Sequence, residues 1–230
     1  CIHRGASEIG GSCVEISTST TKVLIDIGLQ LYGKKASIPK TSGECDAVLI
    51  SHPHMDHYGL IDYLSENVPV YSGELGKRLI QASRLFTNKP LLKRDFIHFN
   101  AWESFEIGDL EITPYLVDHS ATDAYAFLIE GDGKRVFYSG DFRAHGRKGV
   151  LFENMLKKPP KFIDVMLMEG TMLERDKKGC IDEKAVEEEF VNRMKKTDDL
   201  WFLLCSSQNI DRLVSAYRSA LSGTILMMMS

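Results

Sequence analysis

The feature that most constrains this chain is a short loop crowded with metal-binding side chains directly after an apolar segment. Residues 47–50 are all apolar, which predicts a buried strand, and the residues that follow read Ser-His-Pro-His-Met-Asp-His. His52 and His54 form an H-x-H pair, which lies on one side of an extended segment and can bind one ion. Asp56 and His57 then point towards a second ion. Imidazole and carboxylate without thiolate suit Zn, and also Mn or Fe.

Four other predicted strands also end in a polar residue of a type that binds metals. These residues are Asp26 after the strand 22–25, His119 after 110–117, Asp141 after 135–138 and Glu169 after 165–168. Sites in α/β proteins are assembled at the ends of strands. We therefore expect the five loops to converge on one site.

Hydrophobic periodicity predicts a strand-rich first part with two helices. The predicted strands are 12–17, 22–27, 47–51, 68–72, 104–107, 110–117, 124–130, 135–138 and 165–168, and the predicted helices are 58–66 and 75–86. The strands 12–17 and 22–27 are expected to form one hairpin, and residues 131–133 read Gly-Asp-Gly, which indicates the turn of another.

After about residue 178 the pattern changes to that of a second domain. Asp182 can cap a helix that runs to Lys196, residues 200–205 are expected to form a buried strand, Ser206 or Ser207 caps a second helix, and residues 224–229 form a further strand. A strand, a helix and a strand in about 30 residues make a parallel βαβ unit. The predicted domains are 1–177 and 178–230.

Composition and charge exclude several classes of protein. The five cysteines are odd in number and include no C-x-x-C pair, which argues against a disulfide framework and a structural zinc knuckle and favours a cytoplasmic location. No apolar run approaches the roughly 20 residues of a membrane helix. The net charge of -4 argues against a nonspecific nucleic-acid coat. Residues 134–161, however, hold eight lysines and arginines against two acids, beside Asp141, where a polyanion would pass.

In its strand-end histidines and aspartates, the sequence resembles the metallo-β-lactamase fold hydrolases. The family's H-x-H-x-D-H signature is matched by residues 52–57, and the resemblance covers roughly residues 1–175. It implies an α/β fold, a partial αββα sandwich. It also implies that one zinc ion is held by His52, His54 and His119, that a second is served by Asp56, His57 and a bridging Asp141, and that a buried Asp26 orients the metal-binding loop.

Within this fold, the sequence is most similar to the β-CASP nucleases, a group that includes ribonuclease J. The similar segments are residues 5–11, 138–143, 168–171 and 206–212, the last at the strand-to-helix step that opens the β-CASP cap domain. Glu169 matches the first acidic motif of the group. The group's two later histidine motifs have no counterpart before Ser230, so we expect a fragment that ends within the start of the cap domain.

The resemblance implies a zinc-dependent phosphodiester hydrolase, a ribonuclease of RNA processing or decay that uses a two-metal-activated water. The expected catalytic residues are Asp56, Asp141 and Asp26, and the expected substrate-binding residues are Ser120, Arg143 and Glu169. Two zinc ions are the expected cofactor, with Mn as the alternative, and RNA is the expected partner, with DNA as the alternative.

Other interpretations stay open at this point. One is a hydrolase of a small thioester or lactam substrate, and another is a non-catalytic relative that binds nucleic acid. A fragment without the later histidine motifs could also be inactive. The sequence leaves the oligomeric state open, including a homodimer.

Overall fold

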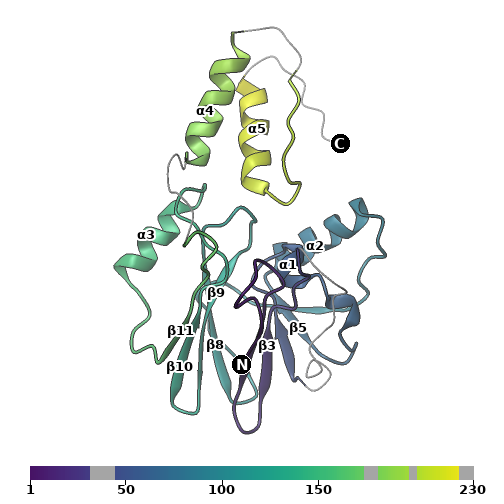
Figure 1. Cartoon of the computed structure of the whole chain (residues 1–230), viewed down its shortest axis with the longest axis vertical. Coiled ribbons are helices and arrows are strands. Elements are labelled where there is room, and N and C mark those ends of the chain that lie inside the picture. The colour runs from purple at the N-terminus through teal and green to yellow at the C-terminus, as the bar shows by residue number, and fades with distance from the viewer. Residues whose placement is uncertain (32–44, 174–180, 197–200, 223–230) are drawn as a thin grey trace.

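The computed structural model describes residues 1–31, 45–173, 181–196 and 201–222, and its centre is a pair of β-sheets (Figure 1). In these residues the first sheet has the order β1 (Ile2–Arg4), β2 (Cys13–Ser17), β3 (Lys22–Ile25), β4 (Ala47–Leu49), β5 (Val70–Ser72) and β6 (Phe96–His98). The second has the order β11 (Val165–Leu167), β10 (Lys134–Tyr138), β9 (Tyr125–Gly131), β8 (Leu110–Leu116) and β7 (Phe105–Ile107). The helical segments are α1 (Met55–Tyr58), η2 (Ile61–Tyr63), α2 (Glu74–Phe86), α3 (Gly149–Lys157), α4 (Glu183–Met194) and α5 (Ile210–Ser222).

Side chains of the first sheet alternate between two apolar cores. Ile25 and Leu49 face the second sheet and pack in one cluster with Phe127 of β9. Leu24 and Val48 belong to another cluster, which includes residues of α1 and α2. Because successive side chains on a strand point to opposite faces and both faces are covered, these strands have continuous apolar sequences.

Helices cover the outer faces of both sheets. Ile80 of α2 packs in the cluster on the outer face of the first sheet, and Met155 of α3 packs against the cluster on the outer face of the second. The layers are therefore helix, sheet, sheet and helix, which confirms the predicted αββα sandwich (Figure 1). None of the helices in the described residues is long and apolar enough to cross a membrane.

The strands that precede the predicted site residues end on a common edge within each sheet. β3 and β4 are parallel in the first sheet. In the second, β8 and β10 both run antiparallel to β9, and β11 is parallel to β10. Two helices, α4 and α5, pack together beyond the ends of the sheets and form what we call the helical unit (Figure 1).

The predicted helix 58–66 is wrong. The chain forms one helical turn in α1 and a short 3-10 segment in η2. The carbonyl of His57 accepts a hydrogen bond from Ile27 N at 2.8 Å, so it is not available to continue a helix. A side chain at Gly59 would also overlap the carbonyl of Met55 and the side chain of Leu29. Tertiary contacts therefore override the helical spacing at this point.

The first strand of the βαβ unit predicted for the second domain is not formed in the described residues 201–205. The side chains of Phe202 and Leu204 are 92% and 100% exposed. Both predicted helices are present, and Asp182 caps α4 by accepting from Ala185 N at 2.7 Å. At the start of α5, Asn209 rather than Ser206 or Ser207 accepts from the first-turn Arg212 N. The boundary near residue 178 and the strand 224–229 lie outside the described residues.

Candidate metal centre

Three histidines from two loops form the first ligand set, which consists of His52, His54 and His119. His52 Nε2 lies 3.1 Å from His54 Nδ1, and His119 Nε2 lies 3.2 Å from the same His54 atom. The three ligand atoms all lie within 4.8 Å of one another, so one ion could contact all of them. Three imidazoles are a ligand set of zinc sites that keep an open coordination position.

The second ligand set consists of His52, His57 and Asp141 and shares His52 with the first. Its ligand atoms also lie within 4.8 Å of one another, and His57 Nε2 is 3.5 Å from Asp141 Oδ1. Asp56 Oδ2 is 3.8 Å from His57 Nε2, just outside this group. The loops after β4, β8 and β10 thus converge as expected, and both sheets contribute side chains to the centre.

Asp26 lies beneath the second ligand set and is fully buried. Its carboxylate accepts hydrogen bonds from Ser51 N and from the Tyr138 hydroxyl, each at 2.8 Å, and lies 2.7 Å from His57 Nδ1. The φ of Asp26 is 62°, so the sharp turn is made at this residue, and a Cβ at Gly28 would collide with the carbonyl of Asp56. This placement supports the orienting role expected for Asp26 and keeps it away from substrate.

Burial keeps the histidines of the first ligand set neutral. It lowers the pKa of His52 well below its ordinary value, lowers that of His54, and lowers that of His119 to about 3, with the neighbouring imidazoles adding to the shift for His52 and His119. Only a neutral imidazole offers a lone pair to a metal. The set is therefore prepared for a cation, because no proton has to leave first.

The second ligand set has the opposite electrostatics. Burial alone would lower the pKa of His57, but the carboxylates of Asp26 and Asp141 outweigh it and raise the pKa well above its ordinary value. Burial would likewise raise the pKa of Asp141, but His57 outweighs it and lowers the pKa to about 2. In the metal-free protein His57 and Asp141 therefore form an ion pair, and a cation bound there must displace the proton of His57.

Each of three histidines has a partner for the ring nitrogen that points away from the centre. His52 Nδ1 lies 3.1 Å from the Ser51 hydroxyl, and His57 Nδ1 contacts Asp26. His54 Nε2 lies 3.3 Å from the backbone carbonyl of Gln208, in the segment before α5. Such partners fix the tautomer and ring orientation of metal-binding histidines.

Residues 21–197 of the chain match the family model described as Beta-lactamase superfamily domain. The chain belongs to this family. The five strand-end loops that carry the predicted site residues all fall within the matched range. The family match and the ligand geometry therefore concern the same part of the molecule.

Two curated relatives and one solved structure are similar to this family member. It is 28% identical over 218 residues to the Probable RNase MJ4 of Methanocaldococcus jannaschii, covering 85% of this chain and 50% of the relative. It is 30% identical over 180 residues to the RNase J-like protein of the same organism, covering 74% of this chain and 41% of the relative. A protein of unknown function from Enterococcus faecalis V583 has the same fold, with a TM-score of 0.79 and 20% identity over 94% of this chain and 62% of that one. The chain thus spans about half the length of the relatives it matches.

A cavity of about 1100 Å³ opens beside the second ligand set. Its wall includes Asp56, His57 and Asp141 from the centre and Glu169 from the end of β11. The Glu169 carboxylate accepts from Phe142 N at 2.9 Å, and burial raises its pKa above the ordinary value. Glu169 is the one predicted substrate-binding residue that lines this cavity.

The other two predicted substrate-binding residues contact the helical unit instead. Arg143 donates to the carboxylate of Asp211 on α5, and the backbone carbonyl of Ser120 accepts from Asp211 N at 3.3 Å. Other members of the basic stretch are also paired with acids, Arg147 with Glu187, Lys148 with Asp211, Lys134 with Asp164 and Arg135 with Glu130. Much of this stretch therefore neutralises charges within the molecule, which weakens its case as a polyanion track.

Sequence reasoning missed three residues that support the centre. Tyr138 binds Asp26, Gln208 binds His54, and Asp211 binds the loop after β10. Tyr138 directly precedes the motif Ser-Gly-Asp at the end of a predicted strand. This position could have indicated that Tyr138 lies beside the metal centre. Gln208 acts through a backbone carbonyl, for which no side-chain pattern exists.

Proposed function

We propose that the protein is a zinc-dependent phosphodiester hydrolase that acts on RNA. The observation that carries the proposal is the convergence of two ligand sets in one centre, the second of which lines a cavity through His57 and Asp141. Two ions bound about 4 Å apart clamp the attacking and leaving oxygens of a phosphodiester and activate water. Zinc is favoured over harder cations because imidazoles outnumber carboxylates in the two sets, and Mn is the alternative.

The residues of the centre would divide the work by their position. His52, His54 and His119 would hold one ion as neutral ligands, and His57 with Asp141 would hold the other. Asp56 and Asp141 both line the cavity and carry carboxylates beside the ligand sets, so either is positioned to accept a proton from water. Asp26 would act through His57, whose ring it orients.

The choice of RNA rests on the relatives. The two relatives described above carry the names of ribonucleases. The cavity wall includes Asp56, His57 and Asp141, so a substrate bound in it would lie beside the second ligand set. The helical unit would belong to the start of a β-CASP cap domain.

The free thiols of Cys1, Cys13 and Cys205 fit a cytoplasmic location.

The proposal is tested by supplying Zn²⁺ or Mn²⁺ to the protein together with 5′-monophosphorylated and 5′-triphosphorylated RNA oligomers. We expect cleavage that chelation abolishes and that His54→Ala reduces by more than the roughly 10–100-fold caused by loss of a supporting residue. His98→Ala is the matched control, since His98 lies on β6 outside both ligand sets. Failure to cut RNA or single-stranded DNA under these conditions contradicts the proposal. Turnover of a thioester or lactam with RNA left intact supports the small-substrate alternative.

A further inference from the structure

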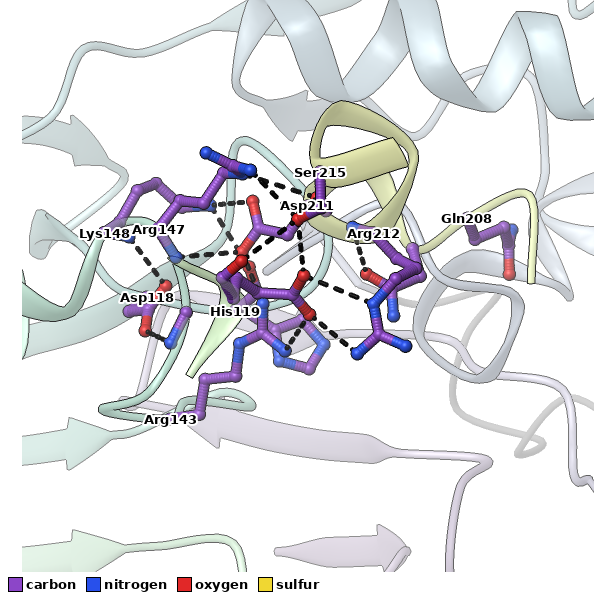
Figure 2. A network of polar contacts seen from close by, with 12 residues as sticks. Asp118, His119, Arg143, Arg147, Lys148, Gln208, Asp211, Arg212 and Ser215 are labelled. Carbon is purple, nitrogen blue, oxygen red and sulfur yellow. Dashed lines mark hydrogen bonds and ion pairs between the residues drawn. The ribbon is translucent and has the colours of Figure 1, made fainter. Parts of the chain in front are cut away.

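A group of charged residues that we call the Asp211 cluster joins the helical unit to the loops of the metal centre (Figure 2). Its members are Asp211, Glu183, Arg143, Arg147, Lys148 and Arg212. The carboxylate of Asp211 accepts from the Arg143 side chain, from Lys148 Nζ at 3.3 Å and from Arg147 N at 3.3 Å. Asp211 is 4% exposed, so these contacts are shielded from water. A single buried carboxylate therefore holds three residues of the loop after β10.

The same cluster fixes the backbone on both sides of the metal ligand His119. The carbonyl of Asp118 accepts from Arg143 N at 2.7 Å, and that of His119 accepts from Lys148 Nζ at 3.1 Å. The carbonyl of Ser120 accepts from Asp211 N at 3.3 Å. Three successive carbonyl groups thus accept hydrogen bonds from residues of the cluster, and these bonds hold the backbone at His119 in place.

The segment before α5 also reaches the ligand His54. His54 faces the other ligands through Nδ1, which leaves Nε2 to donate to the carbonyl of Gln208 at 3.3 Å. The Gln208 side chain in turn donates to the carbonyl of Pro53 at 3.5 Å. His54 thus contacts the segment before α5, and the backbone at His119 contacts residues of the Asp211 cluster, so both ligands are held by groups outside the two sheets.

We propose that the helical unit sets the metal affinity of the first ligand set and that Asp211 is the positioning residue through which it does so. The inference rests on the proposed metal centre. It adds that the metal affinity of the first ligand set depends on a residue that is not itself a ligand. Metal sites lose affinity when the groups that orient their ligands are removed. A cluster that merely fastened two parts of the fold would change stability but leave the affinity of the folded protein unchanged.

The test measures Zn²⁺ affinity of Asp211→Asn by competition with a chromophoric chelator, with Co²⁺ absorption spectra as a second readout of ligand geometry. Circular dichroism establishes that the variant is folded. We expect the Zn²⁺ affinity of the first ligand set to fall about 10–100-fold. Lys148→Met removes the contacts to His119 and Asp211 from a partly exposed side chain, and we expect it to lower the affinity in the same direction.

Glu189→Gln is the matched control, because it exchanges the same functional group on α4, where Glu189 and its partner Arg193 are both exposed. We expect it to keep the wild-type affinity. Wild-type affinity in folded Asp211→Asn, or in Lys148→Met if Asp211→Asn does not fold, overturns the inference while leaving the proposed function intact. A loss in Glu189→Gln as large as that in Asp211→Asn also overturns it. Absence of metal binding in the wild-type protein contradicts the proposed function itself.

Discussion

The two ligand sets of the metal centre differ in what orients their side chains. His57, in the second set, is held by Asp26, a fully buried residue at the end of β3 in the first sheet. In the first set, His54 contacts the backbone of Gln208 before α5, and the backbone carbonyl of His119 accepts from Lys148 of the Asp211 cluster. The second set is thus supported from the core of the sandwich, whereas the first also has contacts that involve the helical unit and the segment before α5.

The contacts that orient the two ligand sets also differ in their separation along the chain. Asp26 and His57 are 31 residues apart and lie on neighbouring strand ends, so their contact forms with the first sheet. His54 and Gln208 are 154 residues apart, and their contact requires the helical unit to dock. Because closing a longer loop costs more entropy, we expect the contact between Asp26 and His57 to be more robust than that between His54 and Gln208.

The largest effect is expected for Asp26→Asn, which alters the support within the sandwich. The change removes the charge that faces His57 and leaves the partners of a buried carboxylate imperfectly bound. Removing one partner of a buried pair costs about 3–5 kcal/mol. Chemical unfolding followed by circular dichroism should show a loss of that size in the free energy of unfolding. A loss below about 1 kcal/mol would contradict the view that the sandwich builds its half of the centre around Asp26.

A smaller and pH-dependent effect is expected for Glu183→Gln, which alters the contact between α4 and α5 within the helical unit. Burial would raise the pKa of Glu183, but hydrogen bonds from Arg212 and Ser215 outweigh it and hold the pKa below its ordinary value of 4.5. Since the folded pKa is lower than the unfolded one, the charged group stabilises the fold above about pH 4.5 and loses this contribution as the pH falls through the folded pKa.

We therefore expect Glu183→Gln to cost about 1.5–3 kcal/mol at pH 7, the range for hydrogen bonds to charged groups, and less below pH 4. Unfolding curves of the wild type and the variant at a series of pH values measure the difference. An equal cost at pH 7 and at pH 3.5 would show that the charge of Glu183 does not contribute to the packing of α4 against α5.

Much of the sandwich and of its half of the centre could be predicted from the sequence. Residues of the candidate metal centre, such as Asp26, His52 and Asp141, follow the ends of apolar strands. Local sequence patterns therefore predict that their loops lie at strand ends. The hairpin turn at Gly131-Asp132-Gly133 was equally local and is present between β9 and β10. Short-range patterns suffice where a residue's role follows from its position on a strand.

The helical unit was predicted less well because its role depends on distant partners. The apolar segment 201–205 resembles a strand, but no strand of the described residues pairs with it. Arg143 is expected to bind substrate and Lys148 belongs to the basic stretch 134–161, yet their partner Asp211 lies 68 and 63 residues away. A basic residue carries no local sign of whether it faces solvent, substrate or a buried acid.

The central claim, that the two ligand sets form one metal centre that holds two ions, is tested most directly by metal analysis of the folded protein. The account predicts about two equivalents of zinc at saturation, and about one in His54→Ala, in which the second ligand set remains. The His98→Ala control should keep the wild-type content. Less than one equivalent in the folded wild-type protein, or an unchanged metal content in His54→Ala, would contradict the account.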